Sequence, residues 1–255
     1  IQPLVLLHQL VSQQLAPQAL LLVTQDAFAN DQATNANAAA EIRLGVHNFP
    51  PYFVMTDNEN CGGDAVTLTR SLLQTDTIKL TTVCATPARL YKMLQSGEVD
   101  LTINIKHTQA LPDNVSFIAP PYVQLSLILL THGAAVAREK QPTIAAIRGF
   151  DYHGQRQVLT EKGYSFIDLP DSISAVEMFI KGRSSALLTY EAPFNYYLQQ
   201  HNLPFEKHYQ CQVLEHIDAF YVVSEQSAHK AYIDNKLTQH ALDEQLSYFS
   251  HYFIA

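Results

Sequence analysis

Two segments of this chain share one order: a helix that ends at a glycine, followed directly by a short apolar strand. In the first, Thr86 and Pro87 mark a helix start, Gly97 follows the last turn, and residues 101–105 alternate as a strand does. In the second, a helix within residues 170–183 stops at Gly182, and residues 186–191 form the strand. The repetition predicts two α/β lobes, although two unrelated helix–strand units would give the same pattern.

Both predicted strands finish in polar side chains. A parallel strand fed by a helix presents its carboxyl end at a crevice, which is where ligands bind in open α/β sheets. We therefore expect the two strand ends to face each other. The candidate ligand-binding residues there are Asn104, Lys106, His107 and Thr108 after the first strand, and Tyr190 and Glu191 after the second.

Length and composition are those of a globular protein. Of the 255 residues, 47% are hydrophobic and 16% are charged, and two lobes of about 100 residues each match normal domain sizes. The net charge is −8 and the basic residues are scattered. This argues against nucleic acid or an anionic membrane surface as the partner, since both require clustered positive charge. No apolar run approaches the ~20 residues of a transmembrane helix.

Residues 1–40 differ from the rest and predict a signal-like segment with a linker. Apolar patches precede Ala27, Phe28 and Ala29, which match the small-x-small pattern of a signal cleavage site, and a polar, alanine-rich stretch follows. No Lys or Arg precedes Arg43, so a retained N-terminal helix is the alternative, and the fate of residues 1–29 is left open. We expect an exported protein of the Gram-negative periplasm, without a lipid anchor at the cleavage point.

The cysteines fit this location. Cys61 follows the first predicted strand and its loop, and Cys84 ends the second strand. If those strands are neighbours, both sulfurs lie at one edge of the sheet, and we expect a disulfide between them. Cys211 is then a free thiol. The spacing contains no CxxC pair and no His/Cys cluster, so we expect neither a metal site nor a cofactor.

The order of elements predicts where the chain passes between lobes. Strands at 42–46, 78–84 and 125–131 and a helix at 64–73 precede a connector at 133–142, and a strand at 219–223 precedes a helical tail at 228–253. Crossings near Thr131 and Val223 would make a hinge. The predicted fold is α/β with two lobes, residues 41–131 plus 224–255 and residues 132–223. Each lobe has a mixed, mostly parallel sheet with helices on both faces.

Four segments in order resemble a known family: IRLGVHNFPPY at 42–52, LQSGEVD at 94–100, VSFIAPPY at 115–122 and IRGFDYHG at 147–154. Behind a signal-like segment, they resemble the extracytoplasmic solute-binding proteins of family 3, the amino-acid type, over roughly residues 41–253. The resemblance implies the type II periplasmic-binding-protein fold. It also implies that two lobes close on a small polar solute, which is delivered to an ABC importer.

The resemblance carries over unevenly to the ligand-binding residues. Tyr52 is similar to the family's aromatic residue against the ligand, and residues 104–108 match the stretch that contacts the ligand's amine and carboxylate. The family's carboxylate-clamping arginine has no counterpart, because Gln109, Ala110 and Leu111 occupy that region. The family's aspartate for the ammonium group corresponds to Tyr190, with Glu191 beside it. Both ionic anchors of an α-amino acid are therefore altered.

Other side chains are candidates to replace these anchors. Lys106 or Arg148 would supply positive charge, and Glu191 or Asp151 would take a cation. An aromatic wall suited to an aromatic or cationic solute would consist of Tyr52, Phe150, Tyr152 and Tyr190. For each of these residues the alternative is a solvated surface charge or a core aromatic.

Three functions remain in competition. The first is a monomeric periplasmic binding protein whose partners are a small polar solute, of unspecified identity, and an ABC permease. The second is an extracytoplasmic sensor that presents its ligand state to a membrane receptor. The third, a cleft enzyme of dehydratase type, would need an acid and a base across the cleft, such as Glu191 with His107 or Lys106. We expect no enzyme, because the sequence has no nucleophile elbow, phosphate loop or paired-carboxylate signature.

Overall fold

The computed structural model describes residues 39–57, 60–106, 108, 110–133 and 141–253. The predicted signal-like segment up to residue 38, His107 and Gln109 lie outside the described residues. Residues 39–255 form one compact unit. Within it, eight strands make a single mixed sheet in the order β4-β1-β5-β10-β6-β9-β7-β8, and β2 (Val54–Met55) and β3 (Cys61–Gly62) form a small separate ribbon. No helix in the described part is long and apolar enough to cross a membrane.

The first lobe is built on three parallel strands, β1 (Ala40–Val46), β4 (Ile78–Cys84) and β5 (Leu101–Ile105). Its helices are α1 (Asp64–Leu73), α2 (Pro87–Ser96) and α6 (Lys230–Asp243), followed by the 3₁₀ helix η2 (Phe249–Phe253). Leu90, Tyr91 and Leu94 of α2 pack on one face of the sheet. The other face packs against α1 and α6. The sheet is therefore covered on both faces, as predicted.

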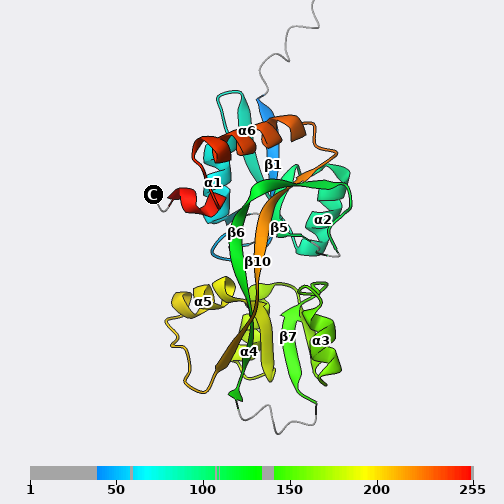
Figure 1. The fold of residues 1–255 in the computed structure, drawn as a ribbon, viewed down its shortest axis with the longest axis vertical. Coiled ribbons are helices and arrows are strands. Elements are labelled where there is room, and N and C mark those ends of the chain that lie inside the picture. The colour runs from blue at the N-terminus through cyan, green and yellow to red at the C-terminus, as the bar shows by residue number, and fades with distance from the viewer. Residues whose placement is uncertain (1–38, 58–59, 107, 109, 134–140, 254–255) are drawn as a thin grey trace, which may run out of the picture. The chain divides into compact units, whose positions relative to one another are not determined.

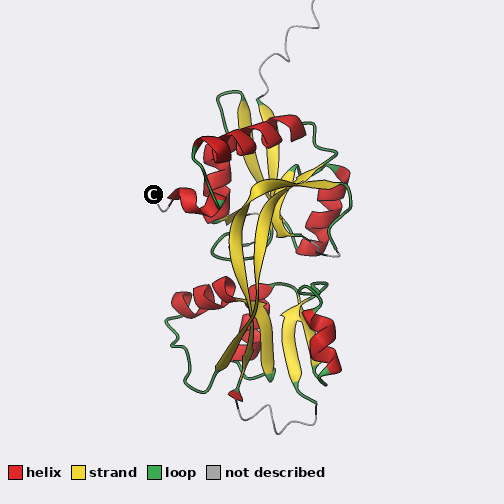
Figure 2. Cartoon of the chain, viewed as in Figure 1, coloured by secondary structure: helices red, strands yellow, loops and turns green. Residues whose placement is uncertain are grey.

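The second lobe repeats this arrangement. Its strands are β7 (Thr143–Ile147), β8 (Ser165–Leu169) and β9 (Ala186–Tyr190), with β7 parallel to both others. Its helices are α3 (Gln155–Glu161), α4 (Ser172–Ile180) and α5 (Glu191–Gln200). Phe179 of α4 and Phe194 of α5 belong to one cluster on one face, and Leu159 of α3 packs in the core on the other face. Helices flank the strands in both lobes (Figure 2).

Two long antiparallel strands join the lobes, β6 (Val115–Thr131) and β10 (Gln210–Ser224). Figure 1 shows them running side by side from the helices of the first lobe to those of the second. Residues 127–131 of β6 pair with β9, and residues 219–223 of β10 pair with β5. The chain thus crosses before Leu127 in β6 and before Ala219 in β10, rather than near Thr131 and Val223. Register shifts in β10 flank residues 215–219 on both sides.

The two helix–glycine–strand units have the predicted form. Gly97 ends α2 with φ 77° and Gly182 follows α4 with φ 65°, and this left-handed conformation favours glycine. Asp171 caps α4, because its carboxylate accepts a hydrogen bond from the Ser174 backbone N–H at 2.9 Å. Thr86 precedes α2, but its side chain makes no capping hydrogen bond.

All five residues of β5 are buried, including the polar Thr102 and Asn104. One expectation about local structure was wrong. The C-terminal tail is not one helix, because α6 ends at Asp243 and Gln245 takes a left-handed φ of 50°. Leu242, near the end of α6, has 67% of its surface exposed.

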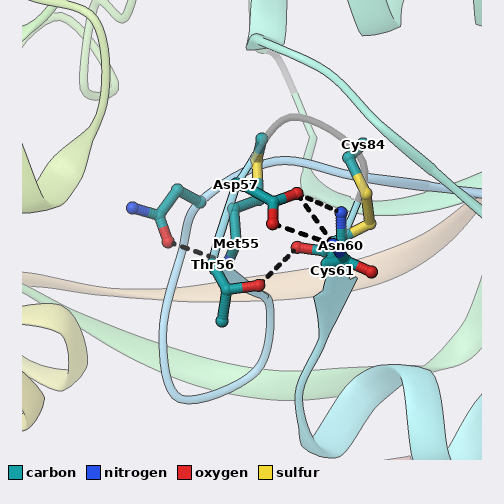
Figure 3. The surroundings of a disulfide bond; sticks show 7 residues. Met55, Thr56, Asp57, Asn60, Cys61 and Cys84 are labelled. Atoms are coloured by element: carbon teal, nitrogen blue, oxygen red, sulfur yellow. Dashed lines mark hydrogen bonds between the residues drawn. A yellow bond between two sulfur atoms is a disulfide. The ribbon is translucent and has the colours of Figure 1, made fainter.

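The predicted disulfide is present. The sulfur atoms of Cys61 and Cys84 are bonded at 2.03 Å and join β3 to the end of β4. Figure 3 shows the bond beside a tight loop, in which the Asp57 carboxylate accepts hydrogen bonds from the backbone and side chain of Asn60. Cys211 is free and exposed. The disulfide therefore ties down one end of the segment that follows β1.

Candidate functional site

A cavity lies where the carboxyl ends of β5 and β9 approach each other. Its volume is about 430 Å³ when the space at its open mouth is counted, and its enclosed free space is about 30 Å³. That enclosed space has room for only one or two water molecules. Both lobes line it, with Asn104 at the end of β5 and Tyr190 at the end of β9. Its aromatic lining consists of His47, Phe49, Tyr52, Phe53, Tyr122, Phe150 and Tyr190.

The first lobe contributes a rigid turn directly after β1. The backbone N–H of Phe49 donates to the Phe53 carbonyl at 2.9 Å, and Phe53 N–H donates to the Phe49 carbonyl at 3.0 Å. The Tyr52 carbonyl accepts from Ala65 N–H, one of the donors that the first turn of α1 leaves unpaired within the helix. This close approach needs Gly63, where a Cβ would lie 2.3 Å from the Tyr52 oxygen. The helix and the turn thus hold the Tyr52 ring at the cavity.

The second lobe contributes Phe150 and Tyr190. Arg156 fixes the loop that carries Phe150, because its guanidinium donates to the carbonyls of Phe150 and Ile147 at 2.8 and 3.0 Å. Tyr190 ends β9 and is 1% exposed. The ring centres of Tyr190 and Phe49 are 5.4 Å apart in an edge-to-face contact, so the lobes touch across the cavity.

Two further contacts join the lobes beside the cavity. The Ser172 hydroxyl donates to the Asn48 carbonyl at 3.1 Å. The Nε2 atom of His153 lies 3.4 Å from the Lys106 carbonyl oxygen. Together with the Phe49–Tyr190 contact, they define a closed arrangement of the lobes.

The titratable groups of the cavity are neutral near pH 7. Burial lowers the pKa of His47 to about 4, so its imidazole is uncharged. Burial raises the pKa of Tyr52 and Tyr122, and it raises the pKa of Tyr190 well above its usual value. Among the described residues, neither His47 Nδ1 nor the Tyr190 hydroxyl has a hydrogen-bond partner. The lining is therefore neutral and mainly aromatic, and two of its residues, His47 and Tyr190, each carry a buried polar atom without a partner.

The structure brings four of the predicted site residues to the cavity: Tyr52, Asn104, Phe150 and Tyr190. The Asn104 side chain is already occupied. Its amide donates to the Tyr91 hydroxyl at 2.7 Å, and its oxygen accepts from Ile105 N–H and from the Thr108 hydroxyl. Thr108 is buried and supports Asn104, and it does not line the cavity.

The other predicted residues lie away from the described lining. The Lys106 ammonium is 4.2 Å from the Phe220 ring centre, and Arg148 and Glu191 are exposed. The Asp151 carboxylate accepts from Gly154 N–H and borders a separate groove beside α3. The Tyr152 hydroxyl accepts from Ile147 N–H at 2.7 Å, so this ring supports Tyr190 from behind. His107 lies outside the described residues.

Sequence reasoning missed His47, Phe49, Phe53 and Tyr122. His47 follows β1 directly, and the carboxyl end of a strand was the signal that identified Asn104 and Tyr190. Phe49 and Phe53 flank the double proline in the same turn as Tyr52. Within the described residues, no group of three His, Cys, Asp or Glu side chains could hold a metal ion.

No family model and no curated protein sequence matches this chain. Solved structures do. A histidine-bound substrate-binding protein of an ABC uptake transporter from Streptococcus pneumoniae has a TM-score of 0.65 at 16% identity, over 83% of this chain and 91% of that one. A histidine kinase sensor domain with similarity to periplasmic binding proteins has a TM-score of 0.62 at 16% identity, over 81% and 92%. An ancestral amino acid-binding protein, a precursor of cyclohexadienyl dehydratase, has a TM-score of 0.62 at 17% identity, over 80% of this chain and 91% of that one. The predicted fold is confirmed.

Proposed function

Because the chain has the two-lobe fold of the periplasmic binding proteins, we propose that it binds a small solute by closing its lobes, outside the cytoplasm. The observation that carries this proposal is the aromatic cavity at the carboxyl ends of β5 and β9, with Tyr52 from one lobe and Tyr190 from the other. Ligand pockets are typically concave and largely apolar, with a few polar groups that fix orientation. His47 Nδ1 and the Tyr190 hydroxyl are such groups.

The small enclosed space supports a mechanism of opening and closing. About 30 Å³ admits little more than water, so a larger solute enters only when the lobes separate. We propose that the lobes move about the middle of β6 and β10, where the chain crosses and where β10 has its register shifts. Contacts that a ligand makes to both lobes would then favour the closed state.

We favour delivery of the solute to an ABC importer, and a sensor role with a membrane receptor is the second candidate. Both uses occur among structures with this fold, as a substrate-binding protein and as a kinase sensor domain. A neighbouring gene for a permease would support the first role, and one for a histidine kinase would support the second. The enzyme alternative has less support, because Glu191 and Lys106, named as an acid and base pair, do not line the cavity.

The test begins with native mass spectrometry of the freshly purified protein, followed by a thermal-shift screen of small compounds. We expect a co-purified small mass, or a compound that raises the melting temperature in a concentration-dependent way. The stabilisation should be lost in Tyr52→Ala and in Phe150→Ala, which remove one wall from each lobe. Tyr196→Ala, on α5 and away from the cavity, is the matched control. A protein with no bound mass and no stabilising compound would contradict the proposal.

A further inference from the structure

The described lining of the cavity contains no charged side chain. The groups that titrate there are His47 and three tyrosines, and burial keeps all of them neutral near pH 7. A charged ligand group would therefore find no counter-ion in the described wall. Burying an ion without a partner is unfavourable, far more so than burying a hydrogen-bonded neutral group.

Three charged side chains around the cavity are already engaged. The Asp151 carboxylate accepts from Gly154 N–H at 3.3 Å, and a carboxylate oxygen of Glu215 lies 3.2 Å from Nδ1 of His153. The Lys106 ammonium lies over the ring of Phe220. Recruiting any of these three charges to a ligand would first break an existing contact. Asp64 also acts on this wall, because after burial its negative charge adds to the rise in the pKa of Tyr52 and Tyr122, but it does not line the cavity.

Polar atoms are nevertheless present and unused. Among the described residues, His47 Nδ1 and the Tyr190 hydroxyl are buried and have no hydrogen-bond partner. Buried polar atoms in native proteins are nearly always hydrogen-bonded, so two exceptions on residues that line one cavity need an explanation. A ligand with a hydroxyl, carbonyl or amide group would satisfy them without introducing charge.

The shape of the wall adds a preference for rings. The Tyr52 and Tyr122 rings meet edge to face with centres 5.8 Å apart, and Phe49 meets Tyr190 in the same way at 5.4 Å. Such walls present both ring faces and ring edges to an occupant, which favours flat aromatic or conjugated molecules.

We infer that the ligand is an uncharged, flat ring compound with at least one hydrogen-bonding group, bound against Tyr52 and Tyr190, and not a zwitterion. This inference rests on the proposed function, because it names the ligand class of the same cavity.

The experiment compares molecules that share one ring and differ in charge. Ligand-free protein is titrated calorimetrically at neutral pH with 2-phenylethanol and phenylacetamide, which are neutral, and with L-phenylalanine, phenylacetate and 2-phenylethylammonium, which are charged. We expect each neutral compound to bind at least about tenfold tighter than every charged one, since a charge without a counter-ion is strongly disfavoured. A charged compound that binds as tightly as the neutral ones would overturn the inference.

A second measurement addresses the hydroxyl group. Tyr190→Phe should weaken binding of phenylacetamide about 3- to 10-fold, because it removes one hydrogen bond and keeps the ring. Tyr196→Phe, outside the cavity, should leave the affinity unchanged. The chain contains no tryptophan, so tyrosine fluorescence reports binding directly in both variants. Equal affinity of Tyr190→Phe and the parent protein would refute the role of this hydroxyl.

The result also separates this inference from the proposed function. If none of the five compounds binds but a co-purified solute is found, the charge of that solute tests the inference. An uncharged ring compound supports the inference. An ionic solute overturns it but still supports the proposed solute-binding function. If neither the series nor any co-purified or screened molecule binds, the proposed function fails and the ligand class fails with it.

Discussion

Replacing Cys61 and Cys84 together with serine should destabilise the protein strongly. The two residues are 23 positions apart, and the bond between them closes the segment containing α1 and all of β4. The loop-closure entropy of a segment of this length corresponds to about 3.5 kcal/mol at 25 °C. For a domain of this size, that loss lowers the melting temperature by about 7–14 °C.

Urea unfolding followed by circular dichroism measures this loss. The parent protein should shift to a lower midpoint when dithiothreitol is added, and the double variant should not respond. Cys211→Ser is the matched control, because this exposed thiol is not bonded and its loss should change the free energy of unfolding by less than about 0.5 kcal/mol. A double variant within about 1 kcal/mol of the parent protein would refute the entropic reasoning.

Three further changes have defined outcomes. Gly63→Ala should lower the free energy of unfolding by about 2–3 kcal/mol, because at φ 110° the added Cβ would lie 2.3 Å from a backbone oxygen. Gly149→Ala, also at positive φ but in open space, should lower it by about 1 kcal/mol. Equal losses for the two variants in urea unfolding would disprove the steric argument. The pKa of His47 falls to about 4 on folding, so below neutral pH the unfolded chain binds more protons than the folded protein, and the free energy of unfolding should drop by about 3 kcal/mol from pH 7 to pH 4. His47→Phe should remove that part of the pH dependence. An unchanged dependence of the free energy of unfolding on pH in this variant would contradict the prediction. Asp171→Ala should cost about 1 kcal/mol by loss of its helix cap, and Thr86→Ala only a few tenths, because the Thr86 hydroxyl makes no capping bond.

The elements that the sequence predicted best are those with local signals. The helix at 64–73 and the strand at 78–84 have the predicted bounds, since apolar spacing and flanking polar residues define them within a few positions. The end of α6 had no such signal. Neither glycine nor proline follows Asp243, and the turn depends on Gln245 taking an uncommon left-handed conformation.

The burial of β5 on both faces depends on partners far away in the chain. The Thr102 hydroxyl donates to the Gly45 carbonyl across 57 residues, and the Asn104 amide donates to the Tyr91 hydroxyl of the helix above. A polar side chain can be buried when the protein interior provides a hydrogen-bond partner for it. An alternating pattern alone does not reveal the hydrogen-bond partners that allow Thr102 and Asn104 to be buried.

In the candidate site too, local sequence signals predicted some features, whereas others depend on contacts between distant segments. Tyr52 and Phe150 lie shortly after a strand and Tyr190 ends one, and these carboxyl ends, which the sequence reveals, meet at one cavity. Lys106 also follows a strand, yet its ammonium lies over Phe220, on a strand far later in the chain. That aromatic contact arises only when β10 pairs with β5. Position after a strand therefore predicts proximity to the cavity, but not the direction of a long side chain.

The insertion of the second lobe between parts of the first has a consequence for how the chain folds. The strands β7, β8 and β9 and their helices are close in sequence, so they can assemble early. The first lobe cannot be completed until β10 and α6 have been synthesised. For example, the Ser224 hydroxyl of β10 donates a hydrogen bond to the Leu94 carbonyl of α2, 130 residues earlier in the chain. Until β10 arrives, β5 and β6 each present an open edge, and such edges invite pairing with other chains. A chain cut short before residue 210 should therefore aggregate, even though most of both lobes has been made.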